Sequence, residues 1–115
     1  MGAHLDLFVA SGGAVERLGS DEPVRVGDQM VFRVSSDQPS RVGVWVNGPE
    51  GAGEIGWQSA GPDPVTLGDS YGKTATTYRF ERPGRYVFTA STVQVGPEGI
   101  CEPPACVRTV VEVRP

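Results

Sequence analysis

The chain has 115 residues, of which 38% are hydrophobic and 21% charged, and 10 Lys and Arg against 14 Asp and Glu give a formal net charge of -4. This length suits one domain rather than two. The cations are scattered singly, so the basic stripe that nucleic acids or anionic membrane surfaces require is missing, and we expect neither as a partner.

The N-terminal residues 1–4, Met-Gly-Ala-His, suggest a cloning-derived start, which leaves residues 5–115 as a single domain. The 16 Gly and 10 Pro interrupt the chain so often that no stretch free of both exceeds 11 residues. An amphipathic helix of ordinary length therefore has no place. No apolar run reaches the ~20 residues of a membrane span, so we expect no direct membrane insertion of this domain.

Between these breakers, alternation of apolar and polar residues predicts short, half-buried strands. In chain order they cover residues 5–9, 30–35, 42–46, 54–59, 74–80, 85–90 and 107–113. The strand over 54–59 is the weakest, and Asn47-Gly48-Pro49 before it is a strong turn signal. In the strand over 74–80, Tyr78 and Phe80 are expected to face inward and Arg79 outward.

About seven short strands separated by turns favour an all-β fold, an antiparallel immunoglobulin-like sandwich of two sheets, over a small barrel. One local pattern supports the sandwich. Tyr86 follows a tight turn at Pro83 and Gly84, where its ring can be buried and its hydroxyl can bond back to the turn backbone. This pattern resembles a tyrosine corner.

Two stretches resemble known families. The sequence Tyr-Arg-Phe-Glu-Arg-Pro-Gly-Arg-Tyr-Val-Phe at 78–88 resembles the penultimate-strand signature of PKD-type and related immunoglobulin-like modules, common on bacterial secreted and surface proteins. The N-terminal half, at 5–9, 15–18, 24–35 and 41–44, is similar to the extracytoplasmic β-domains that follow the membrane span in some bacterial zinc-finger anti-sigma factors. These resemblances imply a bacterial extracytoplasmic module and carry no catalytic residues over to this chain.

Two short motifs match functional patterns in their letters. Residues 51–56, Gly-Ala-Gly-Glu-Ile-Gly, match the dinucleotide fingerprint, but no helix follows and a hairpin is expected. Residues 68–72, Gly-Asp-Ser-Tyr-Gly, match the nucleophile elbow, but the only histidine, His4, precedes them. We therefore expect no cofactor and no active serine.

Acidic residues supply the remaining chemical candidates. Glu50 with Glu54, and Asp63 with Asp69, are candidate carboxylate pairs for acid–base chemistry, although acids in loops rich in Gly and Pro are most often solvated turn formers. Asp63, Asp69 and Ser70 would offer oxygen ligands to calcium, but no dense Asp-x-Asp run accompanies them. With one histidine and no catalytic constellation, we expect no enzyme.

The two cysteines, Cys101 and Cys106, flank a loop that holds two prolines. With only His4 in addition, they cannot complete a four-ligand zinc site. A disulfide is the favoured interpretation; two reduced cysteines that cap the last hairpin, and a redox-active pair, are the alternatives. A disulfide would contribute about 2 kcal/mol, stiffen the loop and imply an oxidising compartment such as the periplasm or cell exterior.

Aromatic side chains are the candidate contact residues, namely Trp45, Trp57 and Tyr71. In the alternation scheme Trp45 and Phe8 point away from the valine and leucine faces. Because small sandwiches commonly bury one Trp between their sheets, Trp45 is expected there with a shifted strand register. The alternative is an aromatic platform for a sugar or a peptide.

The expected function is that of a non-catalytic extracytoplasmic interaction or sensory module of a bacterial envelope protein, membrane-anchored or secreted, with a protein partner that binds along an exposed edge strand. The alternative is an accessory spacer or carbohydrate-binding sandwich of a secreted enzyme or adhesin, with a polysaccharide as ligand.

Overall fold

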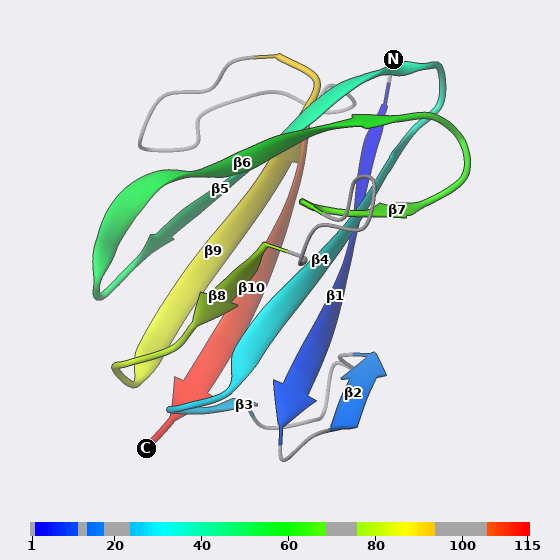
Figure 1. Cartoon of the computed structure of the whole chain (residues 1–115). Helices are drawn as coiled ribbons and strands as arrows, with labels where there is room; N and C mark the ends of the chain where they lie inside the picture. The colour runs from blue at the N-terminus through cyan, green and yellow to red at the C-terminus, as the bar shows by residue number, and fades with distance from the viewer. Residues whose placement is uncertain (1, 12–13, 18–23, 69–75, 94–105) are drawn as a thin grey trace.

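The computed structural model describes residues 2–11, 14–17, 24–68, 76–93 and 106–115, and within them all regular structure is β-strand, arranged in two layers (Figure 1). The all-β, two-sheet expectation is confirmed for this part of the chain; the count of about seven strands is not. The described residues form ten strands: β1 (Ala3–Ser11), β2 (Ala14–Arg17), β3 (Val24–Arg25), β4 (Gln29–Ser36), β5 (Ser40–Gly48), β6 (Gly51–Ala60), β7 (Val65–Thr66), β8 (Thr77–Arg79), β9 (Gly84–Ser91) and β10 (Cys106–Arg114).

Sheet A has the strand order β2-β1-β4-β7, with β8 also beside β4, and sheet B has the order β3-β10-β9-β5-β6. Most neighbours are antiparallel, but β3 pairs with β10 in parallel, Val24 opposite Val113 and Arg25 opposite Arg114. The expectation of a purely antiparallel sandwich is therefore wrong at this edge. A strand of two residues has too few positions for alternation to reveal it.

The core lies between the two sheets and follows the predicted alternation of the long strands. In β4 the residues Met30, Phe32 and Val34 are fully buried, and the ring of Phe32 meets that of Phe88 from β9 at 5.3 Å between centroids. The predicted directions in 74–80 are confirmed, since Phe80 is fully buried, Tyr78 packs against the core and Arg79 is exposed. The strand itself, β8, is shorter than expected.

Tyr86 is fully buried at the start of β9, and its hydroxyl donates a hydrogen bond to the carbonyl oxygen of Arg82 at 2.7 Å. The predicted bond from this tyrosine back to its turn is confirmed. Gly48 lies so close to the Tyr86 ring that a Cβ there would overlap it. Pro49 in turn contacts the position that a Cβ of Gly84 would occupy, so the β5–β6 turn packs against the turn before β9.

Candidate functional site

Glu50 lies in the two-residue turn between β5 and β6 and links the two sheets. Its Oε2 accepts a hydrogen bond from the Tyr78 hydroxyl at 2.6 Å, and its Oε1 accepts one from the Glu81 N–H at 2.8 Å. Burial alone raises the pKa of Glu50, but these hydrogen bonds outweigh burial and hold the pKa below its ordinary value. Burial and the Glu50 carboxylate together raise the pKa of Tyr78 well above its ordinary value. Glu50 is thus an ionised structural link at neutral pH.

Glu54, the expected partner of Glu50, uses a different donor. It lies in β6, and its Oε1 accepts a hydrogen bond from Nε1 of Trp57 at 2.6 Å. The two carboxylates are therefore each engaged separately, which does not resemble a shared-proton pair. Asp63 is exposed in the segment after β6, whereas Asp69 and Ser70 lie outside the described residues. The second carboxylate pair and the calcium site stay predictions.

A groove runs between the first half of β6 and the start of β8, with a volume of about 360 Å³. Residues 51–55 line one side, residues 76–78 line the other, and Val46 and Glu50 complete the walls. A second groove of about 460 Å³ shares Glu50, Thr77 and Tyr78 with the first. The grooves therefore adjoin each other along the line where the outer strand of sheet B meets β8 of sheet A.

Strand β6 is the outermost strand of sheet B on the side away from β3, and Figure 1 shows it crossing the upper part of the molecule. Among the described strands it pairs with β5 alone, through nine of its ten residues. In that pairing an irregularity falls between Val44 and Trp45, where Ile55 of β6 has no partner. The sequence pattern predicted only residues 54–59 here, because the glycines at 51 and 53 weaken the alternation. The sequence predicted an exposed edge strand but did not identify β6 as that strand, although the turn signal before it marks a hairpin.

Residues 51–56, which match the dinucleotide fingerprint, lie within β6. No helix follows them, so the hairpin interpretation is confirmed. The nucleophile-elbow match at 68–72 falls almost entirely outside the described residues. Neither motif has the strand-to-helix setting that its chemistry needs in the described part of the chain.

Trp45 and Trp57 pack edge to face, with ring centroids 5.2 Å apart and an angle of 83° between the planes. Gly43 leaves room for the pair, because a Cβ there would lie 2.5 Å from Cη2 of Trp45. The guanidinium carbon of Arg41 lies 6.0 Å from the centroid of the Trp57 ring. Trp45 is only 4% exposed and Trp57 is partly exposed. Trp57 is thus the accessible member of the pair.

The position of Trp45 differs from the one expected. Strand β5 keeps a regular register with β9 through Val44, Trp45 and Val46. Val44 and Val46 belong to the core between the sheets, so alternation places Trp45 on the opposite, outer face of sheet B. The expected burial of Trp45 is confirmed, but its expected place between the sheets is wrong. The irregularity beside Trp45 adds a residue to β6 and does not shift β5 against β9, and Val44 and Val46 fill the inner face.

The remaining predicted residues lie in other parts of the molecule. Cys106 begins β10 and is buried, while Cys101 lies outside the described residues, so their disulfide stays a prediction. Tyr71 also lies outside the described residues. The structure therefore gathers Glu50, Glu54 and Trp57 along one edge of sheet B. The predictions that involve Asp69, Ser70, Tyr71 and Cys101 stay untested.

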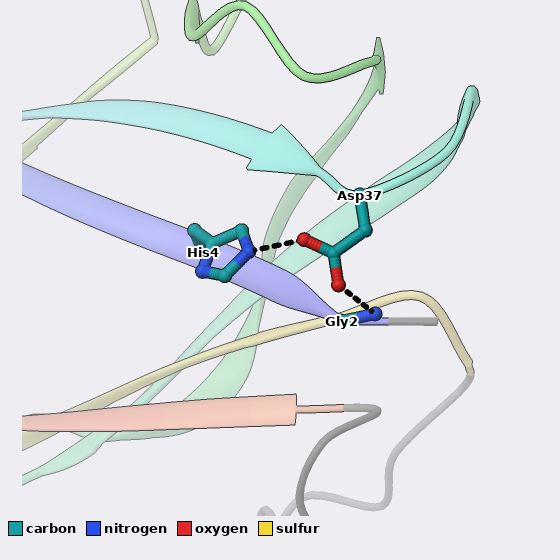
Figure 2. Close-up of polar contacts among 3 residues, drawn as sticks. All are labelled: Gly2, His4 and Asp37. Carbon is teal, nitrogen blue, oxygen red and sulfur yellow. Dashed lines mark hydrogen bonds and ion pairs between the residues drawn. The ribbon is translucent and has the colours of Figure 1, made fainter.

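The start of the chain is joined to the turn between β4 and β5 (Figure 2). His4 Nε2 lies 2.7 Å from Oδ1 of Asp37, and the N–H of Gly2 donates to Oδ2 at 3.1 Å. The bond with His4, opposed by burial and assisted by Gly2, lowers the pKa of Asp37. Ala3 and His4 belong to β1, and Ala3 is part of the core. Because both side chains of this pair are largely exposed, their contact adds little stability.

Among the described residues, no three His, Cys, Asp or Glu side chains gather as a metal site requires. The same part of the chain holds no helix of the length and apolar character that crossing a membrane demands. Comparison with protein-family models, with curated proteins and with solved structures gives no match for this chain. Its function must therefore be argued from the geometry of the groove and of the β6 edge.

Proposed function

We propose that this chain is a non-catalytic interaction module, an immunoglobulin-like sandwich of a bacterial envelope protein that binds a protein partner through β6. The observation that carries this proposal is the outer side of β6, which pairs with no other described strand and lies beside the groove of about 360 Å³. An exposed strand edge presents backbone donors and acceptors that a partner strand can complete. Three features support the immunoglobulin-like assignment. They are the parallel β3–β10 pair at one edge of sheet B, the β5–β6 hairpin at the other edge, and the hydrogen bond from the Tyr86 hydroxyl to the Arg82 carbonyl.

Placement outside the cytoplasm rests on the resemblances of residues 78–88 and of the N-terminal half, and on the predicted disulfide between Cys101 and Cys106. The full parent gene tests this placement. We expect an upstream membrane span or a cleavable signal. A parent gene with neither would contradict an envelope location.

Selection from a random peptide library on the immobilised protein tests recognition through β6. We expect peptides whose binding is lost in Ala52→Pro, because proline removes a backbone donor from β6. Ala52→Val is the matched control, since it keeps the N–H and favours a strand. Selected peptides that bind both variants equally would contradict recognition at this edge.

A second candidate function, carbohydrate binding, is favoured by Trp57. The guanidinium carbon of Arg41 lies over the partly exposed ring of Trp57, and the carboxylate of Glu54 accepts a hydrogen bond from Nε1 of that ring. An aromatic surface flanked by such polar groups suits a sugar. Retention on chitin, cellulose or peptidoglycan that is lost in Trp57→Ala would support it. Trp45→Ala should reduce retention indirectly, because buried Trp45 packs against Trp57 and holds its ring in place. If none of these polysaccharides retains the protein, carbohydrate binding is contradicted and protein binding is the remaining proposal.

A further inference from the structure

The geometry points to the kind of partner that β6 accepts: an extended peptide that adds as a strand beside residues 51–55 and places a basic side chain opposite Glu54. This inference rests on the proposed function, because it assumes that the β6 edge is the binding surface. It goes further by assigning a backbone register and a charge to the partner.

The backbone register follows from the turn. Pro49 and Glu50 form a two-residue turn, so Gly48 and Gly51 form a hydrogen-bonded pair. Hydrogen-bonded and non-hydrogen-bonded pairs alternate along an antiparallel ladder. The N–H and C=O groups of Ala52 and Glu54 therefore point away from β5, toward the open side of β6.

Those groups have no backbone partner among the described residues, since β5 is the only described segment whose backbone bonds to residues 51–55. The second half of β6 differs, because the Gly68 N–H donates to the side chain of Gln58 and Leu67 packs near Gly56. The irregularity at Ile55 separates the two halves. Strand addition is thus confined to the first half of β6, the part that lines the groove.

The charge follows from the groove. The ionisable residues along it are Glu50 and Glu54 on the β6 side and Tyr78 in β8. No Lys or Arg lines this groove, whereas Arg79 and Arg82 line the adjoining groove of about 460 Å³. Neither carboxylate forms an ion pair with a described cation. Glu50 is committed to Tyr78 and Glu81, whereas Glu54 keeps one oxygen beyond its bond with Trp57. A Lys or Arg opposite Glu54 on the added strand would be its cross-strand partner.

A second copy of this chain is a poorer occupant. Antiparallel pairing of two β6 strands over residues 51–55 would bring two Glu54 carboxylates into one short ladder. Like charges in neighbouring cross-strand positions destabilise a sheet. The charge of this edge therefore favours a basic partner over self-association.

Two short peptides of alternating Thr and Val, one with a central Lys and one with a central Glu, provide the probe. Amide spectra of the labelled protein measure both dissociation constants and locate the contact. We expect the Lys peptide to bind about fivefold more tightly and to shift the amide signals of Ala52 and Glu54. Glu54→Gln should remove most of this preference. Glu112→Gln, the same charge change on β10, should keep it.

The outcomes separate the charge inference from the proposed function. Equal binding of both peptides at β6, or a preference that survives in Glu54→Gln, overturns the basic partner and leaves strand addition standing. If neither peptide shifts the amide signals of Ala52 or Glu54, both the basic partner and strand addition at β6 are overturned. A further outcome is sedimentation as a dimer, with the Ala52 and Glu54 amides protected from hydrogen exchange in the absence of peptide. That result would assign the edge to a second copy and overturn the inference.

Discussion

Replacing Glu50 with glutamine tests whether an ionised carboxylate holds the β5–β6 turn against β8. The carboxylate accepts hydrogen bonds from the Tyr78 hydroxyl at 2.6 Å and from the Glu81 N–H at 2.8 Å. The single oxygen of an amide cannot replace both carboxylate oxygens, and a hydrogen bond to a charged group contributes about 1.5–3 kcal/mol. Glu50 is partly exposed, so water replaces much of what is lost. We expect Glu50→Gln to lower the free energy of unfolding by about 1 kcal/mol at neutral pH.

The effect of Glu50→Gln should depend on pH with a definite sign. The pKa of Glu50 in the folded protein lies below its ordinary value of 4.5, so folding favours the ionised form. The stabilisation by the carboxylate is therefore complete above that ordinary value and is lost as the pH falls through the lowered folded-state pKa. Glutamine does not titrate. The stabilities of the wild type and of Glu50→Gln should thus converge in acid.

Urea unfolding followed by tryptophan fluorescence, in buffers from neutral to acid, measures this difference. Tyr78→Phe and the double variant complete the comparison, since coupled residues give effects that do not add. We expect Tyr78→Phe to cost less in the Glu50→Gln background than in the wild type. A stability difference that is constant across pH, or strictly additive single effects, would refute the link between Glu50 and Tyr78.

Three further substitutions test the packing that positions this site. Tyr86→Phe removes the donor to the Arg82 carbonyl and should cost about 1–2 kcal/mol in thermal unfolding, whereas an unchanged midpoint would deny this bond a role. Gly43→Ala places a Cβ 2.5 Å from Trp45 and should cost about 1–3 kcal/mol and alter the near-ultraviolet circular dichroism; an unaltered spectrum would contradict the close packing. The buried hydroxyl of Ser36 has no partner among the described residues, so Ser36→Ala should leave urea stability within about 0.5 kcal/mol or raise it, and a clear loss would reveal a bond.

The long strands could be predicted from the sequence because each carries enough alternating positions to define an inner face. Met30, Phe32 and Val34 are an example, since all three are fully buried as their spacing predicts. The Tyr86 turn was also predictable, because the chain itself brings Arg82 within reach of the hydroxyl. The two-residue strands and the parallel β3–β10 pair were not, since long-range pairing and not local pattern forms them.

The candidate site was predictable only in part. Glu50, Glu54 and Trp57 were identified by residue type, and all three lie at one edge. Their roles depend on partners that spacing does not reveal, such as Tyr78, which is 28 residues from Glu50. For Trp45 the local pattern was right and the general expectation was wrong. Alternation along the strand placed its side chain on the outer face, whereas the tendency of small sandwiches to bury one Trp between their sheets suggested the core.

Amide hydrogen exchange of the free protein tests most directly whether β6 offers an open edge. The amides of Gly51 and Gly53 face β5, while those of Ala52 and Glu54 face the open side. After correction for intrinsic rates, we predict protection at Gly51 and Gly53 and little protection at Ala52 and Glu54. Ala52 and Glu54 amides as strongly protected as those of their glycine neighbours would show that this edge is already covered, and would contradict the proposed binding surface.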